Sequence, residues 1–261
     1  MESHHQRVIE RLTGLFEDDP NFLALIIGGS VARGWVRPDS DVDIVLIATD
    51  EEYARREAVE SYHYFNPDLC DYPGGYVDGK IVNLDFLREA ADHGSEPARA
   101  VFVGAFAAFN HAPEVDDLLK RIPVYPECER EEKIKAFYTQ VLILNWYMGE
   151  AEKRGDPYLL NHAAGQLVLY GGRLILAHNR ILYPYHKWFM RVLNGAPDKP
   201  AGFMELADSL LRQPSGESAR AFTDCVSAFQ DWGVSFPQAV VRFIKDAEWN
   251  WRGRRPPLAD W

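Results

Sequence analysis

The sequence predicts an α+β protein in which a region of alternating strands and helices is followed by an all-α helical bundle. Up to about residue 122, short apolar runs bounded by turns alternate with stretches of helical composition. The rest of the chain carries long apolar stripes at helical spacing and no convincing strand. The segment Arg121–Glu127 contains two prolines and separates the patterns. We therefore expect one domain over residues 1–122 and a second over residues 123–261.

The first domain begins with an amphipathic segment. Val8, Leu12 and Leu15 follow one another at steps of four and three, which predicts a helix over about residues 3–18. Three short apolar runs then predict strands, and residues 51–65, between the last two runs, have helical composition. The predicted strands cover Phe22–Ile27, Val42–Thr49 and Lys80–Phe86.

The second domain is predicted from apolar residues that recur every three or four positions, which is the spacing of one face of a helix. Three such stripes are present, and a further short helix should follow Pro237. The stripes are Ile134, Phe137, Val141, Leu144 and Met148; Leu160, Ala163, Leu167, Gly171 and Leu174; and Phe222, Val226, Phe229 and Gly233.

Charge and composition restrict the classes of partner. The chain has 28 basic and 39 acidic residues, a net charge of -11, which disfavours a nucleic acid and favours a neutral or cationic small substrate. No apolar run approaches the roughly 20 residues that cross a bilayer, and the N-terminus carries charges, so we expect a cytoplasmic protein without a membrane span. Three scattered cysteines indicate free thiols.

A glycine-rich turn follows the first predicted strand. Gly28 and Gly29 lack a Cβ, so backbone N–H groups there can approach an anion closely, and the start of a short helix near Val31 adds further donors. The Ser30 hydroxyl supplies one more donor. These three residues predict a phosphate-binding loop, and Arg33, just beyond it, is a candidate phosphate contact as well as an ordinary surface charge.

Paired carboxylates stand at the head of the second predicted strand. Asp41 and Asp43 are two residues apart, so their side chains leave the same face of the strand. Such a pair repels unless a cation lies between them, and hard oxygen ligands favour Mg²⁺, which also binds substrate phosphates. Asp85 would join them if the third predicted strand lies beside the second. Three carboxylates around one or two ions suit in-line attack at phosphorus.

This combination resembles a known family. The residues GGS at Gly28–Ser30, a ten-residue gap, DVD at Asp41–Asp43 and a later strand carboxylate are similar to the signature of the DNA polymerase beta-like nucleotidyltransferase superfamily. The resemblance implies a mixed sheet over the first ~120 residues and an enzyme that transfers a nucleoside monophosphate from a nucleoside triphosphate to a hydroxyl, releasing pyrophosphate. It assigns the triphosphate to the loop and Mg²⁺ to the paired carboxylates. Asp85 would be either a third metal ligand or the general base.

The helical half resembles the appended domain of small-molecule nucleotidyltransferases such as the aminoglycoside and lincosamide adenylyltransferases. That architecture implies AMP transfer from ATP to a small, cationic or neutral acceptor such as an antibiotic. The segment Asn179–Trp188 resembles one in other relatives, and its Lys187 is a candidate nucleotide contact. Glu150 and Glu152 are further candidates for the base, although a solvated helix face is the commoner role of such residues.

Two alternatives stay open. The acceptor could be a protein or an RNA end, as in nucleotidyltransferase toxins, antitoxins and tailing enzymes, or the chain could be a scaffold that binds nucleotide without turnover. The tail Trp249–Trp261 combines aromatic residues with arginines, and we expect it to dock on the chain's own surface or at an oligomer contact. A homodimer is therefore a further candidate partner.

Overall fold

The computed structural model describes residues 2–252, and the chain divides into two compact units, residues 1–125 and 126–261. The last nine residues of the basic tail lie outside the described residues, so its docking stays a prediction.

No helix within residues 2–252 combines the length and the apolar character needed to cross a membrane. The cysteines Cys70, Cys128 and Cys225 are free thiols, which confirms the interpretation of their spacing.

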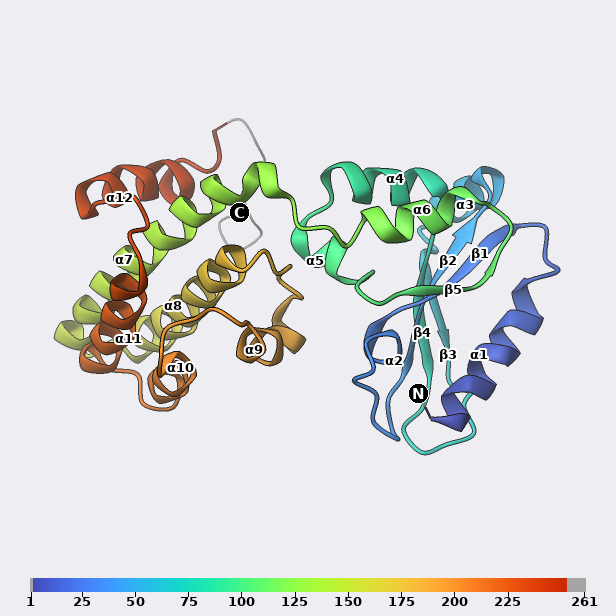
Figure 1. Cartoon of the computed structure of the whole chain (residues 1–261), viewed down its shortest axis with the longest axis horizontal. Coiled ribbons are helices and arrows are strands. Elements are labelled where there is room, and N and C mark those ends of the chain that lie inside the picture. Colours follow the sequence, from blue (N-terminus) through green and yellow to red (C-terminus); the bar gives the residue numbers. More distant parts are fainter. Residues whose placement is uncertain (1, 253–261) are drawn as a thin grey trace. The chain divides into compact units, whose positions relative to one another are not determined.

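A five-stranded sheet in the order β3-β4-β2-β1-β5 forms the centre of the N-terminal unit (Figure 1). Strands β2 and β4 run parallel and all other neighbours run antiparallel, so the sheet is mixed. The central strands β1 and β2 are almost wholly apolar because side chains are buried on both faces. The strands are β1 Phe22–Ile27, β2 Val42–Ala48, β3 His63–Asn66, β4 Val77–Val82 and β5 Phe106–Asn110.

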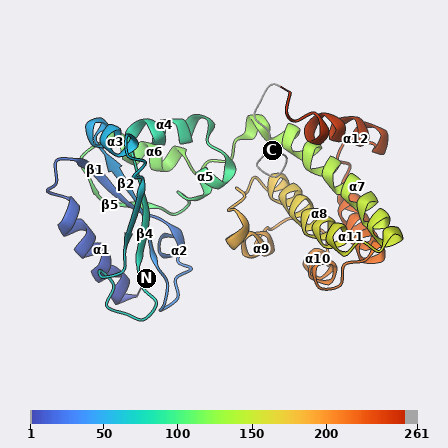
Figure 2. The ribbon, with the colours of Figure 1, turned by 180° about the vertical axis from the view of Figure 1, so that it is seen from behind.

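Helices cover both faces of this sheet, as the two opposite views of Figures 1 and 2 show. On one face α1 packs Val8 and Leu12 against a core that includes Ile44 and Leu46. On the other face the core joins Val45 and Ile47 to residues of α4 and α6 and of the segments beside them. The helices of this unit are α1 Ser3–Phe16, α2 Gly29–Ala32, α3 Asp50–Glu57, α4 Leu84–His93, α5 Glu96–Ala100 and α6 Glu114–Arg121.

One end of the second face is polar. Along β2, Asp43 lies on the same face as Val45 and Ile47, because side chains two residues apart project from the same side of a strand. Along β4, Asp78 shares a face with Lys80 and Val82 in the same way. The apolar residues at the carboxyl ends of these strands belong to the core, whereas both aspartates are half-buried. The sheet therefore presents carboxylates at the amino ends of β2 and β4.

Two sequence predictions differ from the structure in this unit. The predicted helix over residues 51–65 ends at Glu57, and its last residues form the edge strand β3. The third predicted strand, Lys80–Phe86, is instead β4, which begins at Val77 and ends at Val82, and α4 starts at Leu84. The side chain of Asn83 accepts a hydrogen bond from the backbone N–H of Phe86 at 3.1 Å, so Asn83 caps α4 and ends the extended segment.

The second unit is helical, as predicted. The apolar stripes of α7 and α8 face their neighbours: Val141 and Met148 are fully buried in α7, and Ala163 and Leu167 in α8. The third stripe belongs to α11, which ends at Phe229. The helices of this unit are α7 Arg130–Arg154, α8 Pro157–His178, α9 His186–Asn194, α10 Phe203–Arg212, α11 Gly216–Phe229 and α12 Phe236–Phe243, with a 3-10 turn at Glu127–Glu129 and a π turn at Ile244–Glu248.

Candidate active site

The glycine turn after β1 is built around the second carboxylate of the pair. The backbone N–H of Gly28 donates to the carbonyl oxygen of Asp43 at 2.9 Å, which fastens the turn to the start of β2. Gly29 has a φ of 58° and lies so close to Asp43 that a Cβ on it would overlap the Asp43 carboxylate. A residue with a side chain would be strained there and would displace the acid. The loop and the acid are therefore adjacent, as the sequence predicts.

Ser30 lies directly after this glycine pair, at the first turn of α2. The residue is 4% exposed, and its Oγ is buried without a hydrogen-bond partner among residues 2–252. A buried hydroxyl without a partner is costly, since it has left water without replacing the hydrogen bond. Such a group is a suitable donor for a phosphate oxygen of a bound nucleotide.

Asp41 lies just before β2 and is held by a contact to Tyr76, the residue just before β4. The hydroxyl of Tyr76 is hydrogen-bonded to the Asp41 carboxylate, and this bond and the carboxylate charge raise the pKa of Tyr76. The carbonyl oxygen of Ser40, the preceding residue, accepts the hydroxyl of Tyr72 at 2.8 Å and lies 3.2 Å from Nε2 of His5. These anchors fix the backbone from which Asp41 projects.

Asp78 is the site residue that the sequence interpretation missed. It is the register partner of Asp43 in the parallel pair β2–β4, so the two α-carbons lie on adjacent strands, about 4.8 Å apart. Nε2 of His63, on the edge strand β3, lies 2.5 Å from Oδ1 of Asp78. The alternation of Val77, Gly79 and Ile81 as one buried face is the signal for this strand, but the Asp-Gly pair at its start is also typical of a turn.

Asp85 does not lie with the other acids, and its assignment to a strand is wrong. It occupies the first turn of α4, where its carboxylate accepts a hydrogen bond from Arg88 at 2.7 Å. Strand β4 carries the chain about 13 Å from Asp78 to Val82 at about 3.3 Å per residue, away from the end of the sheet that holds Asp43. The side chain of Asp85 is 65% exposed, so it serves as a surface ion-pair partner at the opposite end of β4.

A pocket of about 230 Å³ lies beside the carboxylates. Asp43 and Asp78 both line it, together with His63 and Lys80 from the β3–β4 edge and Gly28 from the loop. Within residues 2–252, no three His, Cys, Asp or Glu side chains are grouped as a metal-binding cluster. In this arrangement Asp41 faces Tyr76 and Asp78 faces His63. Carboxylate oxygens are nevertheless the donors that a hard divalent cation prefers, so the chemistry of the side chains present fits such an ion.

The two predicted basic contacts lie in different surroundings. The Arg33 guanidinium donates to the carbonyl oxygen of Ala100 and stacks 5.1 Å from the centre of the Trp35 ring, and its burial lowers its pKa. It fixes the segment before Val101, a residue that lines the pocket. Lys187 is exposed at the start of α9, with its Nζ 5.6 Å from the centre of the Trp188 ring. A nucleotide contact by either residue stays a prediction.

Residues 11–104 match the family model of the nucleotidyltransferase domain, a range that contains the glycine loop, the paired carboxylates and Asp78. The N-terminal unit contains a nucleotidyltransferase domain. The match confirms the resemblance to the superfamily, and general nucleotidyl transfer with a nucleoside triphosphate as co-substrate is the activity that this domain supports.

The fold of the whole chain also has a solved counterpart. The crystal structure of a nucleotidyltransferase-like protein from Exiguobacterium sibiricum aligns with a TM-score of 0.51 at 13% sequence identity, covering 96% of this chain and 81% of that chain. At that identity the likeness establishes the fold, in which a nucleotidyltransferase domain precedes a helical part. No curated protein sequence matches the chain significantly.

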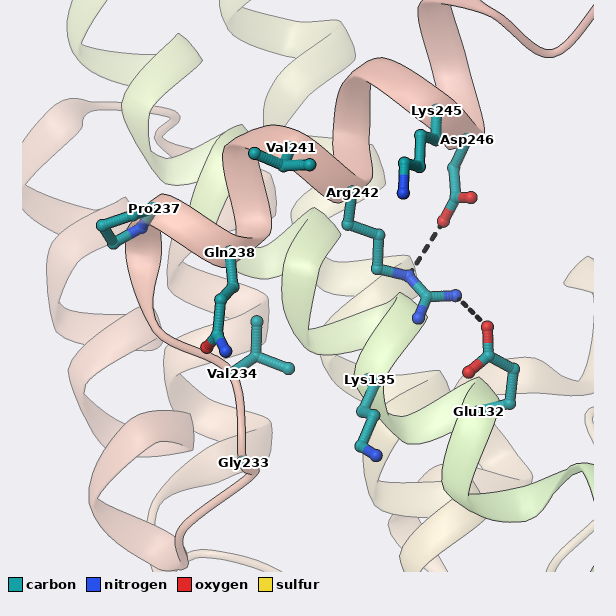
Figure 3. Close-up of a pocket in the computed structure, with 10 residues that line it drawn as sticks. All are labelled: Glu132, Lys135, Gly233, Val234, Pro237, Gln238, Val241, Arg242, Lys245 and Asp246. Carbon is teal, nitrogen blue, oxygen red and sulfur yellow. Dashed lines mark hydrogen bonds and ion pairs between the residues drawn. The ribbon is translucent and has the colours of Figure 1, made fainter.

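A larger cavity, of about 730 Å³, lies in the helical unit between α7 and α12 (Figure 3). Arg242 extends across it and pairs with Glu132 of α7 at 2.6 Å and with Asp246 at 3.0 Å (Figure 3). The acids that line this cavity are thus already paired with a guanidinium. The glycine loop and the carboxylates beside it lie instead in the N-terminal unit, within the residues that match the nucleotidyltransferase domain.

Proposed function

We propose that the chain is a Mg²⁺-dependent adenylyltransferase that transfers AMP from ATP to a hydroxyl of a small acceptor and releases pyrophosphate. The observation that carries this proposal is the packing of the Asp43 carboxylate against Gly29 of the glycine loop, with Asp78 beside it in register. This arrangement brings the glycine turn and the carboxylates to one end of the sheet, as phosphate and metal binding would require. The domain match supports nucleotidyl transfer in general, and the donor, the ion and the acceptor are inferred from the residues.

The loop would bind the triphosphate. The Ser30 hydroxyl is buried without a partner among the described residues, so a phosphate oxygen would satisfy it. Gly29 lets the Asp43 carboxylate lie against the loop, so an ion held by Asp43 would lie beside phosphates bound there. Asp41 and Asp43 would hold one or two Mg²⁺ ions, with Asp78 as the third carboxylate in place of Asp85. A bound ion of this kind neutralises charge on the triphosphate and on the departing pyrophosphate.

The acceptor hydroxyl must lose its proton during transfer. Asp78 is the carboxylate on the pocket wall next to Asp43, and His63 holds one of its oxygens. Asp78 would either accept the proton through its other oxygen or complete the donor set around the ion. Glu150 is paired with Lys153 at 2.8 Å, which lowers the pKa of Glu150, and Glu152 accepts the backbone N–H of Gly216, so both have structural partners.

We infer that the helical unit, residues 123–261 by the sequence boundary, binds the acceptor. This role and an antibiotic as acceptor rest on architectural analogy alone. The net charge of -11 favours a neutral or cationic molecule over a nucleic acid at long range.

The test follows labelled nucleotide. ATP labelled at the α-phosphate should label a small-molecule acceptor and release pyrophosphate with Mg²⁺, and Asp41→Asn combined with Asp43→Asn should abolish both. The same double variant should raise thermal stability in metal-free buffer, because two neighbouring like charges are removed. Glu89→Gln, which removes an exposed carboxylate of α4, is the matched control and should keep wild-type turnover.

Other outcomes decide between the alternatives. Label on protein or RNA instead of on small molecules would favour a macromolecular acceptor. Nucleotide binding without pyrophosphate release over a broad acceptor panel would favour a scaffold. Wild-type turnover by the double variant would refute the assignment of the two carboxylates.

A further inference from the structure

The order of the strands separates two sides of the proposed reaction centre. The glycine loop follows β1, whereas His63, Asp78 and Lys80 belong to β3 and β4 on the other side of β2. In-line displacement at phosphorus requires that the attacking hydroxyl and the leaving pyrophosphate lie on opposite sides of the reacting atom. If the loop holds the pyrophosphate portion, the acceptor hydroxyl approaches over β4 and β3.

The side chains on that approach form one row across the strands. Lys80 is the register partner of Val45 on β2 and of His63 on β3, so these three side chains lie side by side on the face that carries Asp43. Lys80 and His63 both line the pocket of about 230 Å³. At about 30 Å³ per water, that volume corresponds to roughly eight waters, which is room for a small polar group of the acceptor.

The two basic side chains of this row, His63 and Lys80, differ in their contacts. His63 is already engaged with Asp78 at 2.5 Å. Lys80 is exposed and has no ion pair or hydrogen bond from its side chain among residues 2–252. Its ammonium group is therefore available to a ligand. Lys80 follows Asp78 by two residues in β4, so the two side chains are neighbours on the same face of the strand.

We propose that Lys80 selects an acceptor that carries an anionic group, a carboxylate or a phosphate, close to the reacting hydroxyl. The inference rests on the proposed function and sharpens it, because that function assigns the carboxylates of the same pocket, Asp43 and Asp78, to the ion or to the acceptor proton, which leaves Lys80 as the charged side chain for the acceptor. Coulomb interactions act most strongly over a few ångströms, so once the pocket carboxylates face a bound ion, Lys80 outweighs the acidic residues outside the pocket, which solvent and salt screen. An ammonium group at the same position of the acceptor would be repelled.

A set of three matched probes tests this selection by binding. Glycerate, glycerol and 3-aminopropane-1,2-diol share a three-carbon dihydroxy skeleton and differ in a carboxylate, a hydroxyl and an ammonium group; glycerol 3-phosphate is the phosphate arm. Their affinities are measured by ligand-observed NMR with Mg²⁺ and a non-hydrolysable ATP analogue. Wild-type protein should bind the anionic probes about three- to tenfold more tightly than the amine, the range expected for a partly exposed charged contact.

Substitutions of Lys80 test whether this side chain causes the preference for anionic probes. Lys80→Met should remove it and Lys80→Glu should reverse it, with circular dichroism and melting temperature as checks of folding. Lys120→Met removes an exposed cation of α6 and should leave the preference intact. Equal binding of the probes, tighter binding of the amine, no binding of any probe, or a preference that persists in Lys80→Met would each overturn the proposal.

The outcome for the proposed function is read separately. Pyrophosphate release from labelled ATP reports whether transfer occurs at all, whatever the acceptor charge. Transfer without a Lys80-dependent preference would sink only the inference about the acceptor. A Lys80-dependent preference without transfer to any hydroxyl would sink only the proposed function.

Discussion

At the residue scale, Gly29 connects the two halves of the catalytic signature. The absence of a Cβ lets the Asp43 carboxylate lie against the backbone of the loop, and the positive φ favours glycine at the same position. The spacing of GGS and DVD in the sequence therefore reflects a steric requirement as well as a chemical one. The loop and the acid can be adjacent only while residue 29 is a glycine.

Substitution of this glycine should damage activity more than folding. Gly29→Ala should lower stability by about 1–2 kcal/mol, because an L-residue is strained at that φ. It should also displace the Asp43 carboxylate and reduce pyrophosphate release about a hundredfold, since displacements of 1 Å can have effects of that size. Steady-state kinetics and urea unfolding measure the two effects.

Gly14→Ala is the matched control, because Gly14 lies inside α1 with open space around its Cβ position. It should raise stability by up to about 1 kcal/mol through better helix propensity and leave turnover unchanged. Wild-type activity in Gly29→Ala would show that the loop and Asp43 do not need this close contact.

At the element scale, Arg88 shows what Asp85 contributes to the fold. Arg88 donates to Asp85 within α4 at 2.7 Å and to Glu114 of α6 at 2.5 Å, so it joins two helices over one face of the sheet. The hydrogen bond from Arg88 lowers the pKa of Glu114, and the pKa of Arg88 is raised in turn. Asp85 therefore belongs to a surface ion-pair network at the start of α4.

The lowered pKa of Glu114 determines how the contribution of its ion pair with Arg88 to folding stability changes with pH. Glu114 binds its proton less readily in the folded than in the unfolded protein, so its contribution to stability is present above the unfolded pKa, near 4.3, and is lost as the pH falls through the lower folded value. Arg88→Met should lower the melting temperature slightly at pH 7 and have little effect near pH 2. Thermal unfolding by circular dichroism at both pH values measures this difference.

Lys120→Met again serves as the control, since Lys120 lies on α6 without an ion pair among residues 2–252. It should show no such dependence on pH. An equal drop in melting temperature for Arg88→Met at pH 7 and pH 2 would exclude the ion pair as its cause.

The elements also show which local signals are reliable. Strands β1 and β2 were predictable because both are buried on two faces and read as continuous apolar runs. Strand β3 was not, because its four residues lie at an edge with alternate side chains exposed and its pairing with β4 is non-local. Apolar and polar residues alternate over Lys80–Phe86 on both sides of Asn83, as in a strand. The helix begins after Asn83 because this residue caps it, and the alternation does not indicate that.

At the scale of the whole molecule, the change from alternating elements to helical stripes divides the chain near the point where the two compact units meet in sequence. The α+β fold was predictable from periodicity, since helices and strands bury side chains at different spacings. The third acid of the site was not. Asp78 is followed by Gly79, and this pair is typical of a turn. Gly79 nevertheless lies inside β4, where a glycine is needed because a Cβ would overlap the Ile44 side chain of the neighbouring strand.

The proposed function requires that the carboxylates beside the glycine loop hold a divalent ion together with a nucleotide. Electron paramagnetic resonance of Mn²⁺, used in place of Mg²⁺ and titrated with a non-hydrolysable ATP analogue present, measures this binding directly. We expect nucleotide-dependent binding by the wild-type protein and a loss of at least about a hundredfold in affinity in the Asp41→Asn, Asp43→Asn double variant, which removes the two negatively charged ligands. Binding of Mn²⁺ by the folded double variant with wild-type affinity would contradict it.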